Sequence, residues 1–320
     1  MNKERYIEIL EGGEEILLLL NEAKKIKESV FGKKIETCAI VNAKSGLCPS
    51  DCKFCAQSSF WNTNIKTYPL LSEKELLSRI AKAYEFGIDR FSIVTSGIRP
   101  TKEEFKNILK VIEKARSLYS EIKLCASLGQ LDKDSLKALK NAGLSRYHHN
   151  LETARSFYKK ICTKQKWESR YKTAMNVKEI ELSLCCGGIF GLGEKSEHII
   201  EFAQTLKEIS PDSIPVNFLH PIPGTPLEKA NYLTPQKCLR ILIVLRLLLP
   251  DKAIRICGGR EYNLRDLQAF ALFPANALMV GDYLTTKGRN LLNDALMIKD
   301  LGYESNLNIK AITKALKQKC

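Results

Sequence analysis

The chain has 320 residues, of which 44% are hydrophobic and 27% charged, and its formal net charge is +14 at pH 7. These fractions are typical of a soluble globular protein. The sequence predicts no membrane segment. Its most apolar early run, "EEILLLLNEA", is too short to span a bilayer, and the first residues are charged. We therefore expect a cytoplasmic protein whose 11 cysteines bind metal, act in redox chemistry or pack in the core.

The positive charge has two interpretations. Lysines can bind the phosphate backbone of a nucleic acid. In this chain they alternate with acids at helical spacing, as in "KEEFKNILKVIEKAR", and no arginine cluster or aromatic-basic groove accompanies them. A solvated lysine-rich surface is therefore favoured, and a nucleic-acid- or zinc-binding protein is retained as the non-enzymatic alternative.

Short β-branched or apolar runs alternate with amphipathic helical patterns along the chain. The runs are 35–43, 91–96, 122–128, 145–151, 180–187, 213–219, 253–258 and 275–281. Helical patterns open at Ser72, Thr101 and Ser196, each a residue that can cap a first turn. Eight repeats predict an α/β fold, a (β/α)8 TIM-type barrel with an N-terminal helical extension. We expect one domain, with the extension at 1–32, the barrel at 33–290 and a tail at 291–320.

Unusual polar residues and cysteines fall at or just after the ends of the predicted strands. In such barrels the chemistry lies at the carboxyl ends of the strands, so these residues predict one shared site. They are Asn42, Ser96, Cys125, Asn150, Cys185, Asn217, Arg255 and Cys257.

Three cysteines, Cys48, Cys52 and Cys55, follow the first predicted strand at spacings of four and three positions. Soft thiolates this close together suit zinc or an iron–sulfur cluster. A structural zinc site uses four ligands, usually as two close pairs, and no second pair follows nearby. A [4Fe–4S] cluster with three cysteines and one open iron is therefore favoured.

This C-x3-C-x2-C pattern after the first strand resembles the radical S-adenosylmethionine (SAM) superfamily. The resemblance implies that the amine and carboxylate of SAM fill the open iron position, and that an electron from the cluster cleaves SAM to a 5′-deoxyadenosyl radical. Phe54 matches the aromatic residue that this superfamily places beside the adenine.

Nearly the whole chain resembles the biotin synthase family. The matching stretches are "NAKSGLCPSDCKFCAQSS", "CASLGQL", "HNLET", "CCGGIFGLGE", "IPVNFLHPIPGTPL", "IRICGGRE" and "GDYLTTKG". The resemblance implies a sulfurtransferase that inserts sulfur into dethiobiotin to form biotin, taking the sulfur from an auxiliary iron–sulfur cluster, [2Fe–2S] in the family. It also implies a homodimer and an electron donor such as flavodoxin or ferredoxin.

The auxiliary cluster of this family has three cysteine ligands and one arginine ligand. Cys125 and Cys185 match two of the cysteines, and Arg255 matches the arginine. Ser92 stands where the third cysteine is expected, and a serine alkoxide is a poor ligand for iron. Cys257 should share a strand face with Arg255 and is the favoured replacement, ahead of Cys186, which should face the other way.

The resemblance also implies contacts to SAM and to the substrate. The SAM contacts are Phe54, Asn150, Glu152, Arg170, Gly187, Gly188 and Ile189. The substrate contacts are Asn150, Asn217, Thr285 and Thr286.

The remaining residues of interest have no role in this scheme. His148 is interpreted as a hydrogen-bonded residue at a strand end, and Cys38, Cys162 and Cys238 as packing residues. Cys320 is expected to be an exposed terminal thiol. The alternative enzyme is a related radical SAM barrel without sulfur insertion, of the hydrogenase maturase or methylornithine synthase type.

Overall fold

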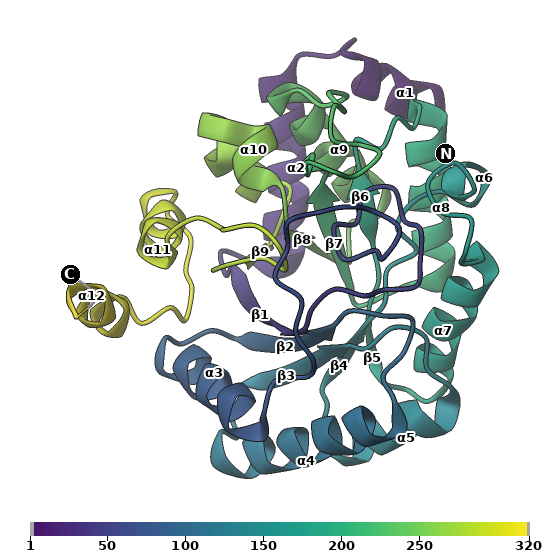
Figure 1. Cartoon of the computed structure of the whole chain (residues 1–320). Helices are drawn as coiled ribbons and strands as arrows, with labels where there is room; N and C mark the ends of the chain where they lie inside the picture. Colours follow the sequence, from purple (N-terminus) through teal and green to yellow (C-terminus); the bar gives the residue numbers. More distant parts are fainter. Residues whose placement is uncertain (1–2, 319–320) are drawn as a thin grey trace.

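The computed structural model describes residues 3–318 of the chain, and at its centre parallel strands form a closed barrel (Figure 1). The strands are β1 (Glu36–Lys44), β2 (Arg90–Thr95), β3 (Lys123–Ser127), β4 (Arg146–His148), β5 (Ser183–Cys185), β6 (Gly188–Phe190), β7 (Ser213–Phe218), β8 (Ala253–Ile256) and β9 (Ala277–Met279). Every pairing is parallel, and the pairing of β5 with β7 closes the ring. The predicted (β/α)8 barrel is confirmed.

The fifth barrel position differs from the sequence prediction, because two short strands, β5 and β6, occupy it in place of one strand. The break falls where neighbouring backbones come very close. A Cβ atom on Gly187 would lie 2.1 Å from the Pro215 carbonyl oxygen, and one on Gly188 would lie 2.2 Å from that of Glu152. Only glycine permits this approach, so these two glycines are needed by the barrel itself.

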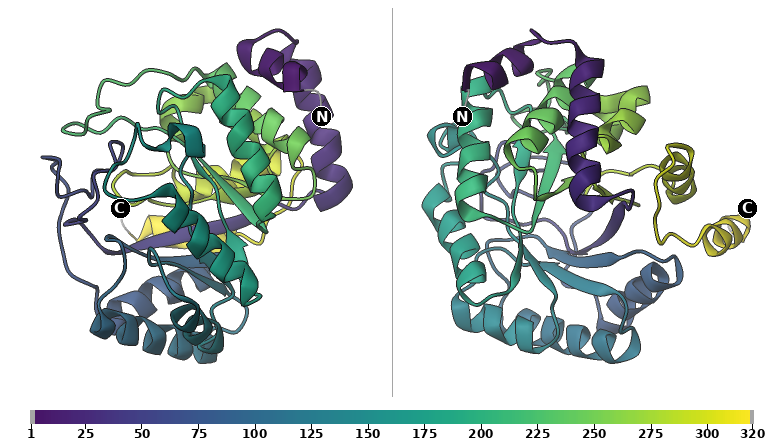
Figure 2. Two further views of the ribbon diagram at one scale, coloured as in Figure 1. Left: turned by 90° about the vertical axis from the view of Figure 1, so that its right-hand side faces the viewer. Right: turned by 180° about the vertical axis from the view of Figure 1, so that it is seen from behind.

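Helices surround the barrel (Figures 1 and 2). They are α1 (Lys3–Glu11), α2 (Ile16–Phe31), α3 (Glu73–Glu85), α4 (Lys102–Leu118), α5 (Lys133–Asn141), α6 (Arg155–Tyr158), α7 (Trp167–Glu179), α8 (Ser196–Ile209), α9 (Pro235–Leu248), α10 (Arg260–Leu264), the 3₁₀ helix η1 (Arg265–Leu272), α11 (Leu291–Asp300) and α12 (Ile309–Lys317). The first two precede the barrel: α1 packs on α8 and α9, and α2 packs on α9. Helices α11 and α12 stand apart from the ring in both figures.

Two of the three predicted helix starts are correct. Ser72 and Thr101 are N-caps with complete capping boxes. The prediction for Ser196 is wrong, because Lys195 is the N-cap of α8. The Ser196 hydroxyl instead donates a hydrogen bond to Glu11, which fastens α1 to the start of α8.

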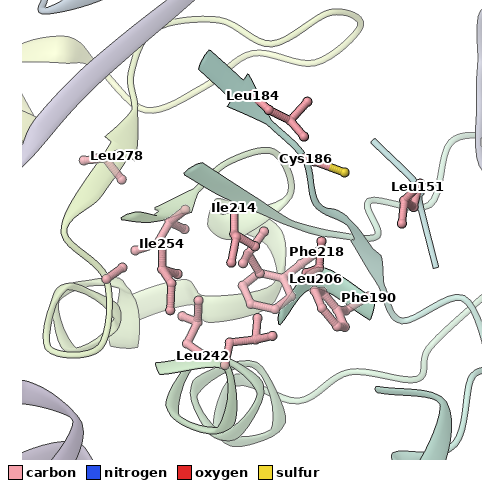
Figure 3. Packing of buried hydrophobic residues seen from close by; sticks show 14 of the residues in the cluster. Leu151, Leu184, Cys186, Phe190, Leu206, Ile214, Phe218, Leu242, Ile254 and Leu278 are labelled. Carbon is pink, nitrogen blue, oxygen red and sulfur yellow. The ribbon is translucent and has the colours of Figure 1, made fainter. Parts of the chain in front are cut away.

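The apolar core lies between the strands and the helices and not inside the ring. Figure 3 shows Ile214 of β7 and Ile254 of β8 beside Leu242 of α9, and all three side chains are fully or almost fully buried. Because side chains alternate along a strand, the opposite faces of these strands point into the barrel and are free to carry polar groups. Among residues 3–318 no helix is long and apolar enough to cross a membrane.

Candidate active site

A cavity of about 380 Å3 lies within the barrel, and it brings together nearly all the site residues predicted from the sequence. Those that line it are Cys48, Cys52, Phe54, Cys55, Ser92, Cys125, Asn150, Glu152, Arg170, Cys185, Ile189, Asn217, Arg255, Cys257, Thr285 and Thr286. Gly187 and Gly188 lie behind this lining, where they support the contact between strands. Residues as far apart in the sequence as Cys48 and Thr286 thus meet in one cavity.

Asn42 does not belong to this cavity, although the strand-end pattern predicts it there. It lines a larger hollow of about 650 Å3 outside the ring, and its side-chain nitrogen donates to the Leu284 carbonyl at 3.0 Å. The register of β1 shifts between Asn42 and Lys44, which changes the direction of the strand end. The outer hollow contains no cysteine, so the inner cavity is the site of interest.

The loop that carries Cys48, Cys52 and Cys55 is folded tightly onto itself. The Cys48 amide donates to the Gln57 carbonyl at 2.9 Å, and the Cys55 amide donates to the Cys52 carbonyl at 3.0 Å. The Trp61 indole also donates to the Cys52 carbonyl at 2.9 Å. These bonds use the backbone groups of the loop and leave the thiols available as ligands at the cavity.

A second segment holds this loop from outside. The Asp51 carboxylate accepts hydrogen bonds from the amides of Thr163 and Lys164, at 2.9 and 2.8 Å. Next to it, the Cys52 sulfur lies 3.6 Å from the sulfur of Cys162. Cys162, predicted as a packing residue, is buried but directly contacts a cysteine of the loop.

The thiols suit a cluster better than a single ion. No group of three or more His, Cys, Asp or Glu residues in the described part of the chain converges closely enough to hold one metal ion. An iron–sulfur cluster has a different requirement, because each cysteine binds a separate iron. Three thiols from one tight loop at the cavity wall meet that requirement.

A polar network lies next to the cysteine loop. Arg170 donates from Nη1 to the Glu152 carboxylate at 3.2 Å and to the Asn150 carbonyl at 3.1 Å, and from Nε to the Tyr158 hydroxyl at 2.9 Å. Both charged side chains are nearly buried, with 11% and 13% exposure. Glu152 has a positive φ of 73°, a strained conformation for a non-glycine residue. A fixed ion pair inside a cavity offers both charges to a zwitterionic ligand.

The predicted substrate contacts lie farther around the wall. The Asn217 amide donates to the Gly188 carbonyl at 3.1 Å and accepts from the Gly258 amide at 3.1 Å, which links β6 to the end of β8. One N–H and one lone pair remain for a ligand. Thr285 and Thr286 lie on the loop after β9, where Thr285 is exposed and Thr286 is partly buried.

A cluster of charged side chains lies at the cavity wall, where Arg90, Arg146 and Arg255 line the cavity. Glu36 forms ion pairs with Arg90, Arg146 and Arg255. Burial opposes ionisation of Glu36, but the three positive charges outweigh it and lower its pKa to about 2. A second nitrogen of Arg255, Nη1, is buried with no hydrogen-bond partner. One carboxylate among three guanidinium groups leaves a net positive site, which suits an anionic cluster held by thiolates.

The cysteines above this ion cluster are all buried. Cys125, Cys185 and Cys257 line the cavity, and the Cys185 sulfur lies 3.4 Å from Nδ1 of His148. Burial lowers the pKa of His148 to about 4, so the imidazole is neutral at pH 7. Cys186 faces away and packs in the apolar core (Figure 3).

Sequence reasoning missed Cys38, Glu36, Arg90 and Arg146. Cys38, predicted as a packing residue, lines the cavity with the other cysteines. It shares a face of β1 with Ile40, which also lines the cavity, but the sequence alone does not show that this face points into the barrel. Cys238 is fully buried in α9 as predicted, and Cys320 lies outside the described residues.

Comparison with known proteins gives consistent matches. The Radical SAM superfamily matches residues 44–206, and the Biotin and Thiamin Synthesis associated domain matches residues 215–304. Biotin synthase of Aquifex aeolicus is 43% identical over 312 residues, 97% of this chain and 94% of that protein. Biotin synthase of Thermodesulfovibrio yellowstonii is 47% identical over 289 residues, 90% of this chain and 91% of that protein.

Solved structures agree on the fold. A methylornithine synthase superimposes with a TM-score of 0.81 at 19% identity, covering 95% of this chain and 94% of that one. An FeFe-hydrogenase maturase from Carboxydothermus hydrogenoformans gives a TM-score of 0.80 at 19% identity, covering 95% of this chain and 75% of that one. At this identity the likeness shows a shared barrel and no shared reaction.

Proposed function

The chain belongs to the biotin synthase family of the radical SAM superfamily, and on that premise we propose that it inserts sulfur into dethiobiotin to form biotin. It is an enzyme of the radical SAM class, which uses SAM and iron–sulfur clusters. The observation that carries the proposal is the cavity itself, since the cysteine loop and a second set of buried cysteines line the same cavity. A substrate between them can meet both.

Two sets of residues would hold the clusters. Cys48, Cys52 and Cys55 suit a [4Fe–4S] cluster with one iron free for SAM. Cys125, Cys185 and Arg255 would hold an auxiliary cluster with one further ligand, for which Ser92 and Cys257 are the candidates from sequence. When bound, the first cluster supplies the electron that cleaves SAM to a 5′-deoxyadenosyl radical, and the second supplies the sulfur.

The other side chains bind and orient. Arg170 can meet the SAM carboxylate, while Glu152, fixed by that arginine, can accept hydrogen bonds from the ribose hydroxyls. Asn217 has a free N–H and lone pair for the ureido ring of dethiobiotin, and Thr285 and Thr286 can donate to its carboxylate. The closed barrel wall keeps water from a radical formed inside it.

Further parts of the proposal concern the setting. The thiolate ligands must stay reduced, so we place the reaction in the cytoplasm. An electron donor of the flavodoxin or ferredoxin type would reduce the loop cluster, and the active form would be a homodimer. Size measurement of the reconstituted protein and reduction by each purified donor would check these two points.

The test is anaerobic incubation of the reconstituted protein with SAM, a reductant and dethiobiotin. We expect biotin, methionine and 5′-deoxyadenosine, all absent in Cys55→Ala. Cys238→Ser, which alters a fully buried thiol on α9, is the matched control and should keep all three products. If 5′-deoxyadenosine forms and biotin does not, the radical chemistry stands but the proposed substrate is wrong.

A further inference from the structure

The structure carries an inference about the missing ligand of the proposed auxiliary cluster. The interior of an eight-stranded barrel of this type is built in layers, each made of four side chains from alternate strands. The strands tilt, and the shear is about eight residues over the whole ring. A shear of eight residues over eight strands amounts to about one residue per strand. To stay at the same height along the barrel axis, one therefore follows the register across two strands and then moves two residues toward the carboxyl end.

The register from β1 to β3 can be followed residue by residue. Cys38 on β1 is in register with Arg90 on β2, and Arg90 is in register with Lys123 on β3. The residue two positions beyond Lys123 is Cys125. Cys38 and Cys125 therefore belong to one layer.

The next two steps repeat this advance, from Cys125 on β3 to Cys185 on β5, and from Cys185 to Arg255 on β8. The intermediate partners are Arg146 and Ser183 in the first step, and Ser213 and Ala253 in the second. Cys125, Cys185 and Arg255 are the residues already assigned to the auxiliary cluster. They lie in the same layer as Cys38.

The last step leads from Arg255 on β8 back to Cys38 on β1. Arg255 is in register with Ala277 on β9, and Ala277 is in register with Glu36 on β1. Two positions beyond Glu36 is Cys38. The layer is thus a closed ring of four side chains, three thiols and one guanidinium group.

The other two candidates lie outside this ring. Ser92 belongs to β2, whose side chains enter the next layer toward the mouth of the barrel. Cys257 follows Arg255 by two residues and belongs to the layer after that. Its thiol contacts the Arg255 backbone carbonyl at 3.6 Å.

The surroundings of Cys38 support the same arrangement. The thiol of Cys38, a residue that is only 7% exposed, lines the same cavity as Arg255, Cys125 and Cys185, the three other members of the ring. In the described structure its only hydrogen bond is a long one, 3.7 Å to the carbonyl of Ala39. Nη1 of Arg255, buried and without a partner, belongs to the same ring.

We propose that Cys38 is the third cysteine ligand of the auxiliary cluster, which is held by Cys38, Cys125, Cys185 and Arg255. A thiolate on β1 thus replaces the one that Ser92 on β2 cannot supply, and the donor set remains three sulfurs and one arginine. The inference rests on the proposed function, because it presumes that an auxiliary cluster forms.

The test uses a parent variant in which Cys48, Cys52 and Cys55 are all alanine, so that every reconstituted cluster is the auxiliary one. Iron, acid-labile sulfide and the Mössbauer spectrum are measured after anaerobic reconstitution. Adding Cys38→Ser should reduce iron and sulfide to background, as Cys125→Ser does. Adding Cys257→Ser should leave both unchanged.

A second variant guards against a folding defect. Adding Ser92→Cys to the Cys38→Ser protein should restore iron and the absorption of the cluster, since the new thiol lies on the adjacent strand, one layer away. A general folding defect would not be cured by this single thiol. Circular dichroism of each apoprotein, with Cys238→Ser as control, checks that the barrel is intact.

The outcomes separate the two proposals. If the parent binds no iron, there is no auxiliary cluster, and both the proposed function and this inference fail. If the parent binds iron and Cys38→Ser keeps all of it, the inference alone is wrong. Loss of iron in Cys257→Ser with retention in Cys38→Ser would assign the ligand to Cys257 instead.

Discussion

The cysteine loop and the floor of the barrel present thiols in two different ways. Here the floor means the ring of Cys38, Cys125, Cys185 and Arg255 together with Glu36 and its arginine partners. In the loop, Cys48, Cys52 and Cys55 lie within eight consecutive residues, and the chain's own turns bring them together. In the floor, cysteines from strands β1, β3 and β5 meet only because the barrel closes. The loop is specified by local spacing, and the floor is specified by register.

The two regions also differ in what stabilises them. The loop is fastened by single hydrogen bonds to its neighbours, among them those that Asp51 accepts from Thr163 and Lys164. The floor rests on Glu36 and its three arginines, inside a continuous ring of strands. We therefore expect damage to the loop to stay local and damage to the floor to affect the whole fold.

The largest effect comes from removing one cysteine from each region. Cys55→Ala should reduce 5′-deoxyadenosine formation to the background of the reductant alone, while the floor keeps its iron. Cys125→Ala should abolish biotin formation but keep reductive cleavage of SAM, because the loop is complete. Product analysis by mass spectrometry checks both, and loss of SAM cleavage in Cys125→Ala would show that the regions are not independent.

Glu36→Gln should destabilise the floor more than any single change in the loop. Within residues 3–318, Glu36 is the ion-pair partner of all three arginines, so the substitution leaves three largely buried guanidinium groups without their counter-ion. The pKa of Glu36 falls from 4.5 to about 2 on folding, which corresponds to about 3 kcal/mol at 1.36 kcal/mol per unit. Chemical denaturation of the apoprotein at pH 7 should show a loss of this size, and a loss below 1 kcal/mol would contradict it.

The ion cluster of Glu36 and its three arginines also predicts that the stability of the fold depends on pH. Because the folded-state pKa of Glu36 lies below its unfolded value, the ionised carboxylate stabilises the fold above pH 4.5. This stabilisation is lost as the pH falls toward 2. The difference in unfolding free energy between wild type and Glu36→Gln should therefore shrink over that range, as measured by denaturation at several pH values. A constant difference would mean that Glu36 acts through packing and not through charge.

This contrast explains what the sequence could and could not predict. The barrel follows from eight repeated runs, and the loop cysteines follow from their spacing, because both are local patterns. The sequence predicts Cys38 as a packing residue, since nothing near it in the sequence shows that the register of β1, β2 and β3 places it in one layer with Cys125. The ion cluster of Glu36 was also missed, because its three arginines come from three other strands.

Asp51→Asn should have a smaller effect, confined to the loop. Burial opposes ionisation of Asp51, but hydrogen bonds from Thr163 and Lys164 keep its pKa low. Asparagine is uncharged and keeps only one acceptor oxygen. The two amides then have a neutral acceptor and the Thr163 hydroxyl loses the second carboxylate oxygen, at a cost of about 1 kcal/mol for a partly exposed group. Hydrogen exchange should become faster in residues 46–60 and remain unchanged in the barrel strands. Faster exchange throughout the barrel would contradict a local role.

The smallest expected effect is that of Cys162→Ser. Because Cys162 lies beside Cys52 but outside the loop pattern, the variant should bind the same amount of loop iron as wild type.

The difference between wild type and Cys162→Ser should appear only in apoprotein exposed to air. There the two thiols, 3.6 Å apart, can lose two electrons and two protons to dioxygen and form a disulfide that blocks a cluster ligand. Wild-type apoprotein should then need a reductant before reconstitution, while Cys162→Ser should not, as thiol titration and iron uptake can measure. Equal loss of iron uptake in both proteins would mean that the contact does not lead to oxidation.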